Sequence, residues 1–213
     1  MIKIQNLKKT YKDCVALDTV SMHIRKGEFV AIIGASGSGK TTLLNIIGGL
    51  DTDYMGSCVV RNKEMSSLSD VECCTLRSRY ISYVYQFFNL ISFLTVKENV
   101  CLASQIKGKK VDAKELNQVL KLLGLEHKKD SFINELSGGQ QQRVAIGRAI
   151  LAHTDIILAD EPTGNLDGEN AKNVMDILKA LNKEGKTIVL VTHDLKIANY
   201  ADRIIRLEQG KIV

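Results

Sequence analysis

Residues 34–41 constrain the fold of this chain more than any other segment. They read GASGSGKT, which fits the pattern G-x-x-x-x-G-K-[ST], and they lie between an apolar run, residues 28–33, and a segment with helical apolar spacing. A strand, a glycine turn and a helix in this order let backbone N–H groups surround phosphate oxygens at the positive end of the helix. The pattern therefore predicts phosphate binding, with Lys40 facing the β- and γ-phosphates and Thr41 facing Mg²⁺.

Further apolar runs at residues 155–160 and 187–192 predict two more buried strands. Between them, apolar residues recur on one helical face and a glycine follows where that helix should end, at Val174, Ile177, Leu178, Leu181 and Gly185. Because continuous apolar strands alternate with helices, we expect a mainly parallel sheet that is covered on both faces.

Two other regions have a different pattern. Alternating apolar residues near the start predict an antiparallel edge layer, at Ile2, Ile4, Val20, Met22 and Ile24. Residues 92–152 contain helical patterns at 114–123 and 140–151 and no apolar run typical of a buried strand. We therefore expect a single domain over residues 1–213, with its sheet core in 1–91 and 153–213 and an inserted helical lobe in about 92–152.

The composition excludes several other classes of protein. The net charge of +5 is mildly basic, and no long basic tract indicates a nucleic-acid arm. No apolar run approaches the ~20 residues that span a bilayer, so we expect any membrane pore to lie in another polypeptide. The five cysteines lack metal-ligand spacing; we expect reduced thiols, with redox chemistry at the adjacent Cys73 and Cys74 as the alternative.

Two carboxylates end the second apolar run. Asp160 and Glu161 fall at the carboxyl end of a predicted parallel strand, the edge where such sheets place ligand chemistry. Asp-Glu after a strand often only marks the surface, but here it accompanies the phosphate loop. We expect Asp160 to hold Mg²⁺ and Glu161 to polarise the attacking water.

Residues 136–140 read LSGGQ, a turn of small residues that opens a helix. Such a turn offers free N–H groups and a hydroxyl to an anion, while Ser137 can also serve as an ordinary N-cap. Together with the phosphate loop, this segment resembles the signature sequence of ATP-binding cassette (ABC) proteins. The resemblance extends over essentially the whole chain and implies a P-loop NTPase with a RecA-like core.

The resemblance also implies a set of site residues. Gln86, Glu161 and His193 would be catalytic, and Thr41, Gln86 and Asp160 would hold the metal. The residues implied to bind ATP are Tyr11, Gly34, Ser36, Gly37, Ser38, Gly39, Lys40, Thr41, Thr42, Ser137, Gly138, Gly139, Gln140 and Asp167. Among these, Tyr11 would stack on adenine, although a packing role in its strand is the alternative.

In this family, the signature of one subunit covers the γ-phosphate held by another. The resemblance therefore implies a head-to-tail homodimer with two ATP molecules at its interface, acting on a separate transmembrane subunit at the cytoplasmic face of a bacterial or archaeal membrane. A regulatory ATPase whose membrane partner moves no solute is one alternative. A nucleic-acid or ribosome-associated ATPase is another, but the chain lacks a duplicated motif set and sustained heptads, and no direct nucleic-acid contact is expected.

A finer resemblance rests on residues 86–90 and 162–167, which are similar to the branch that serves macrolide export, lipoprotein release and antimicrobial-peptide resistance. Phe93 departs from the proline usual in that branch. The apolar stretch that contains it has two interpretations, core packing between the lobes and a groove for a short helix of the membrane subunit; its members are Phe87, Phe88, Leu90, Ile91, Phe93 and Leu94.

Overall fold

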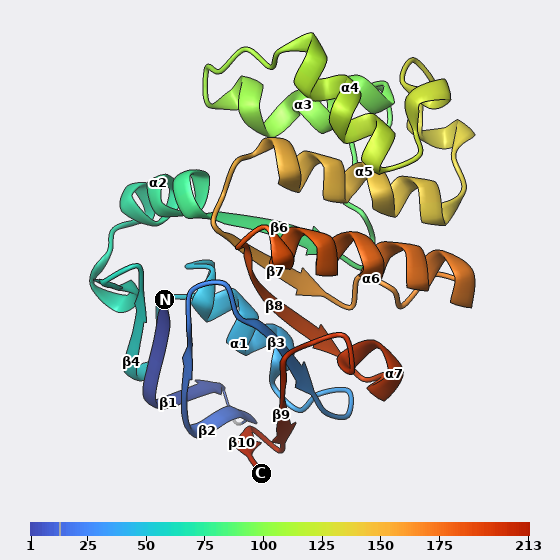
Figure 1. Cartoon of the computed structure of the whole chain (residues 1–213). Helices are drawn as coiled ribbons and strands as arrows, with labels where there is room; N and C mark the ends of the chain where they lie inside the picture. The colour runs from blue at the N-terminus through green and yellow to red at the C-terminus, as the bar shows by residue number, and fades with distance from the viewer. Residues whose placement is uncertain (13) are drawn as a thin grey trace.

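A computed structural model describes residues 1–12 and 14–213. Its larger sheet has the strand order β10-β9-β3-β8-β7-β6 (Figure 1). All neighbouring strands in it run parallel except the β9–β10 pair at one edge. The strands are β3 (Phe29–Ile33), β6 (Ile81–Tyr85), β7 (Ile156–Asp160), β8 (Thr187–Thr192), β9 (Arg203–Glu208) and β10 (Lys211–Ile212).

Each central strand contributes to two hydrophobic cores, because successive side chains of a strand point to opposite faces. On β3, Phe29 and Ala31 pack with helices of one face, while Val30 and Ile32 pack into the core on the other. The strands β7 and β8 divide their residues in the same way. A sheet buried on both faces explains why these segments read as continuous apolar runs.

A second, antiparallel sheet covers one side of the molecule and has the order β2-β1-β4-β5. Its strands are β1 (Ile2–Tyr11), β2 (Cys14–Ile24), β4 (Met55–Val60) and β5 (Lys63–Glu64). The alternating apolar residues of β1 and β2 are buried in the core that also contains helix α1 (Lys40–Ile47). The predicted antiparallel layer is therefore present, and it packs against the phosphate-loop side of the larger sheet.

Helices make up the chain between β6 and β7. They are α3 (Val96–Ile106), α4 (Ala113–Leu122), the 3-10 turns Glu126–Lys128 and Ile133–Glu135, and α5 (Gly138–Leu151). Figure 1 shows α3, α4 and α5 gathered at the top of the view, away from α1. The remaining helices are α2 (Asp70–Tyr80), α6 (Gly168–Lys183), α7 (Leu195–Ala198) and the 3-10 turn Met65–Ser67.

None of the helices formed by the described residues has the length and apolar character needed to cross a membrane. The five cysteines, all within the described ranges, are free thiols.

Candidate active site

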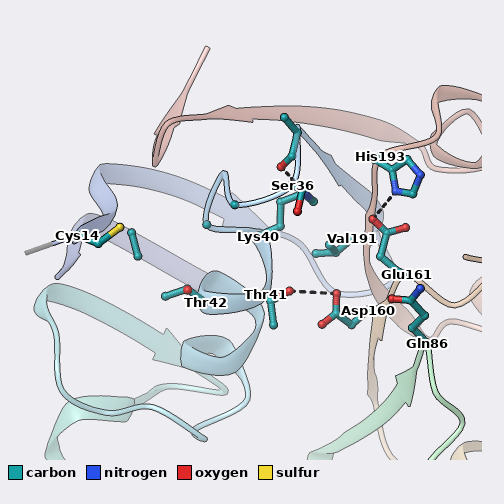
Figure 2. A pocket seen from close by; sticks show the side chains of 14 residues that line it. Cys14, Ser36, Lys40, Thr41, Thr42, Gln86, Asp160, Glu161, Val191 and His193 are labelled. Atoms are coloured by element: carbon teal, nitrogen blue, oxygen red, sulfur yellow. Dashed lines mark hydrogen bonds and ion pairs between the residues drawn. The ribbon is translucent and has the colours of Figure 1, made fainter. Parts of the chain in front are cut away.

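A cavity of about 690 Å³ lies where β3, β7 and β8 end and α1 begins (Figure 2). Parallel strands bring their carboxyl ends to one edge of the sheet, which is why segments far apart in sequence meet here. The wall contains many of the predicted site residues: Ser36, Gly37, Gly39, Lys40, Thr41, Thr42, Gln86, Asp160, Glu161 and His193. It also contains Cys14, Ala16, Ala35 and Val191, for which the sequence carries no signal beyond their nearness to other site residues.

Two glycines of the phosphate loop are required by close approaches of the backbone. A Cβ on Gly34 would lie 2.1 Å from the carbonyl oxygen of Leu207, and one on Gly39 would lie 2.2 Å from that of Ala16. Gly39 also has φ 100°, a left-handed conformation that side chains disfavour. The loop is thus held tightly between β9 and β2 and leads directly into α1.

Lys40 is the first residue of α1 and is only 7% exposed. Its Nζ donates to the carbonyl oxygens of Gly34 and Ala35, both at 2.8 Å. These bonds hold the ammonium over the loop, inside the cavity wall. The hydroxyl of Ser38, one of the predicted residues outside that wall, is buried and makes no hydrogen bond with any described residue.

Thr41 and Asp160 bring a hydroxyl and a carboxylate together across the cavity. The Thr41 Oγ1 donates to Asp160 Oδ1 at 3.4 Å, a bond drawn in Figure 2. Burial raises the pKa of the Asp160 carboxyl above its usual value, the Thr41 hydrogen bond and Lys40 lower it, and the neighbouring Glu161 charge raises it. The site therefore holds a carboxylate whose charged form would be favoured by a nearby cation.

Glu161 and His193 form a second polar pair. Glu161 has φ 46°, and its N–H donates to the carbonyl oxygen of Val191 at 3.0 Å. His193 Nδ1 lies 2.8 Å from Glu161 Oε1. Because a carboxylate oxygen only accepts hydrogen bonds, Nδ1 of His193 carries the proton when Glu161 is ionised.

Gln86 reaches the same cavity from the end of β6. Its Nε2 donates to Asn165 Oδ1 at 3.3 Å, and Asn165 Nδ2 donates back to the Gln86 carbonyl oxygen at 3.1 Å. Sequence patterns did not single out this pairing, which ties Gln86 to the turn after Glu161.

The structure places the signature residues at the start of α5, outside the cavity wall. Ser137 caps α5: its Oγ accepts from the N–H of Gln140, whose side chain accepts from the N–H of Ser137. A Cβ on Gly139 would lie 2.2 Å from Asn170 Oδ1, while the Gly138 backbone has more room. Asp167 caps α6 and also lies away from the cavity.

Tyr11 likewise lies outside the cavity wall, at the end of β1. Its hydroxyl donates to Asp51 Oδ2 at 2.6 Å, and the residue is 45% exposed. Burial and Asp51 raise the pKa of this hydroxyl, while the Thr42 side chain lowers it. Tyr11 pairs with Cys14, a residue of the wall, across the β1–β2 ladder. Stacking of this ring on a nucleotide base stays a prediction.

The sequence pattern of the ABC transporter family matches residues 17–164. The chain belongs to the ABC transporter family. This cassette is 50% identical, over its whole length, to the macrolide export ATP-binding/permease protein of Campylobacter jejuni, but it spans only 34% of that protein. It is also 44% identical to an ABC transporter ATP-binding protein of Methanocaldococcus jannaschii, of which it spans 95%.

The cassette fold is that of solved family members. One structure, a dimeric ATP-binding cassette in a post-hydrolysis state bound to ADP and Pi, is 43% identical, with a TM-score of 0.89 over 100% of this chain and 96% of that one. The predicted α/β P-loop fold and the resemblance to ABC ATPases are therefore confirmed, and the chain is an ATP-binding ATPase cassette.

Proposed function

We propose that this cassette binds and hydrolyses MgATP as the nucleotide-binding subunit of an ABC transporter and drives a separate membrane subunit. One observation carries the proposal: Lys40, Thr41, Asp160, Glu161 and His193, from three segments of the chain, line one cavity. Neither a structural turn nor a surface carboxylate requires this convergence. A phosphate-transfer site does.

The phosphate loop fits a nucleotide by the chemistry of its donors. Lys40 would exchange its two carbonyl partners for phosphate oxygens, a stronger charge-assisted interaction. Gly37 and Gly39 line the cavity and would let the backbone approach the phosphates, and Thr42, further along α1, would lie toward the nucleoside. Gly34 would allow the tight turn before them. Ser36 and the buried Ser38 hydroxyl belong to the same loop.

Mg²⁺ fits the hard oxygen donors Thr41 and Asp160, with Gln86 in the same wall. Bound Mg²⁺ would neutralise phosphate charge as it develops. Asp160, whose burial disfavours its own ionisation, would become charged most readily beside this cation.

Glu161 would act as the base that orients the attacking water, and His193 would hold it in place. The 2.8 Å bond from His193 Nδ1 fixes one carboxylate oxygen and leaves the other, Oε2, for the water. The opposite nitrogen of His193, Nε2, would donate to a γ-phosphate oxygen when the imidazole carries a proton on both nitrogens. Gln86, anchored by Asn165, would contact the same water.

The signature turn would complete the site of another copy of the chain. Ser137, Gly138, Gly139, Gln140 and Asp167 lie outside the cavity wall, so we propose that they meet ATP held by a partner. A solved relative is dimeric. We propose the same head-to-tail homodimer here.

A membrane subunit would dock near β6 and α3. An apolar cavity of about 330 Å³ lies there, lined by Tyr83, Tyr85, Ile106 and Arg148 among others. In the apolar stretch, Phe87 and Phe93 are about three-quarters exposed, whereas Leu90 packs on the core, so both interpretations of this stretch keep support. Binding to this partner would place the cassette at the cytoplasmic face of the membrane. By analogy with the macrolide-export relative, we propose that the complete transporter exports its substrate.

The test is hydrolysis of MgATP by the purified chain and by Glu161→Gln. This variant keeps the size of the side chain but loses the carboxylate, so kcat should fall about 10²- to 10⁴-fold while nucleotide binding persists. Glu184→Gln, an exposed carboxylate at the far end of α6, is the matched control and should keep wild-type turnover. Turnover by Glu161→Gln within threefold of wild type would refute the assignment.

Co-purification from native membranes tests the partner. A transmembrane protein retained with the cassette would support the transporter subunit, whereas ribosomal or nucleic-acid partners would support the alternative class.

A further inference from the structure

Lys9 is a buried lysine on β1, two residues before Tyr11. It is only 5% exposed, an unusual environment for an ammonium group because its desolvation is costly. Two acidic residues compensate it. Its Nζ donates to Asp51 Oδ1 at 2.9 Å and to the carbonyl oxygen of Asp53, and it lies 3.4 Å from Asp53 Oδ2.

The same ammonium lies over the ring of Tyr11, 4.7 Å from its centroid. Asp51 accepts a hydrogen bond from each of these residues. Lys9 Nζ donates to its Oδ1, and the Tyr11 hydroxyl donates to its Oδ2 at 2.6 Å. Desolvation lowers the pKa of Lys9, but the two carboxylates outweigh it and raise that pKa. Lys9, Asp51 and Tyr11 thus form one charged cluster in which each member contacts the other two.

This cluster holds the Tyr11 ring at two points, its hydroxyl and one face. Tyr11 as a whole is nevertheless 45% exposed. Because Lys9 lies over one face of the ring, a ligand would have to stack on the other face. Tyr11 pairs with Cys14 across the β1–β2 ladder, and Cys14 lies in the nucleotide cavity wall.

We infer that Lys9 and Asp51 are positioning residues that fix the Tyr11 ring so that its free face receives the nucleotide base. The inference rests on the proposed function, in which Tyr11 stacks on adenine. A ring already held in place loses little rotational freedom when the base binds, which favours affinity without touching the phosphates.

The experiment compares two ligands that differ in the base. MgADP carries adenine and phosphates, and magnesium pyrophosphate carries phosphates alone; neither has the γ-phosphate that the proposed signature contact needs. Calorimetry on the full chain should show the Kd for MgADP raised about two- to tenfold in Lys9→Met and in Tyr11→Phe, which removes only the hydroxyl bond to Asp51. The Kd for pyrophosphate should stay unchanged.

Lys8→Met is the matched control, because Lys8 is the neighbouring lysine on β1, pairs with Asp18 and does not contact the Tyr11 ring. It should leave the Kd of both ligands at the wild-type value. Tyr11→Ala gives the full loss of stacking and should weaken MgADP more than Lys9→Met does.

Four results would overturn the inference or its premise in different ways. Equal weakening of both ligands in Lys9→Met and Tyr11→Phe would mean a general structural role. Unchanged MgADP affinity in these two variants, with a loss in Tyr11→Ala, would refute the positioning role alone. An unchanged affinity in Tyr11→Ala would refute base stacking itself, and absence of MgADP binding by the wild type would refute the proposed function.

Discussion

Two glycine-rich turns open helices in this molecule, and they are built differently. The phosphate loop leads into α1 through Gly39, and no side chain of the described residues caps that helix. The signature turn leads into α5 through Ser137, whose hydroxyl and partner Gln140 satisfy two N–H groups reciprocally. The first turn lines a cavity with Lys40 over it; the second lies away from that cavity.

The difference shows that a helix N-terminus can be arranged for a ligand or for its own stability. An uncapped turn keeps its N–H groups for an anion, at a cost to the free helix. A capped turn is stable by itself and has fewer donors to offer. In the proposed dimer, the phosphate loop therefore supplies affinity, and the signature turn recognises ATP already held by the partner.

Lys40→Ala should have the largest effect on binding, because it removes the charge that faces the phosphates. We expect the Kd for MgADP to rise at least about a hundredfold, as for the loss of charge-assisted hydrogen bonds. Calorimetry measures it, with the exposed Lys172→Ala on α6 as control. If the Kd for MgADP rose less than tenfold in Lys40→Ala, the phosphate loop would not be the main source of nucleotide affinity, and the proposed difference between the two turns would be wrong.

Ser137→Arg should have the opposite profile. In the Glu161→Gln background, ATP should hold two chains together, and the bulky arginine should weaken this association at least about tenfold by blocking the turn. The Kd for MgADP should stay within twofold of wild type. Light scattering with ATP and with ADP measures both states; association that persists in Ser137→Arg would contradict the composite site.

Much of the phosphate-loop region could be predicted from the sequence, because its signals are local. The strands at Phe29–Ile33 and Thr187–Thr192 are continuous apolar runs within one residue of the predicted bounds, and Ser137 caps α5 as expected. Most residues of the cavity wall were also predicted. For Gln86 and His193, that prediction came from the family resemblance and not from local sequence patterns.

Other features depend on contacts between distant residues. The position of β9 beside β3 follows from strand pairing across the chain, which no local pattern encodes. Helix α2 has little apolar periodicity and was not predicted, although Ser69 and Glu72 cap it well. Cys14 and Ala16 enter the cavity wall, and Lys9 is buried, only because β1 and β2 pack beside α1.

Thr41→Ala should have an intermediate effect that depends on the metal. MgADP binding should weaken about tenfold, while binding in EDTA should stay unchanged, because only the Mg²⁺ ligand is lost. The bond from Thr41 lowers the pKa of Asp160, so its removal raises that pKa further.

Acidification sharpens this prediction. Protonated Asp160 cannot hold Mg²⁺, and because burial raises its pKa, the Mg²⁺-dependent affinity should be lost at a higher pH than for an ordinary aspartate. Thr41→Ala should move this loss to higher pH still. Calorimetric titrations of MgADP across the acid range measure this loss, with binding in EDTA as the reference. If the contribution of Mg²⁺ to the Kd did not depend on pH, the assignment of Asp160 as a metal ligand would be contradicted.

The smallest expected effect concerns stability. Ser137→Ala removes the cap of α5 and should lower the free energy of unfolding by about 1 kcal/mol. Ser69→Ala, at the matching capping box of α2, should cost about as much yet leave ATP-dependent association intact. Denaturant titration measures the free energy of unfolding, and light scattering measures ATP-dependent association. If both variants associated equally well, the Ser137 hydroxyl would have a capping role only.

The left-handed backbone of Glu161 has a consequence for directed evolution. A non-glycine residue at φ 46° lies in a region that glycine occupies with less strain, by about 1 kcal/mol. A library selected only for heat resistance would therefore enrich Glu161→Gly, which has lost its base, wherever the relief of strain exceeds the loss of the His193 bond. Selection for thermostability in this cassette has to be coupled to turnover, because at this position the two criteria favour different residues.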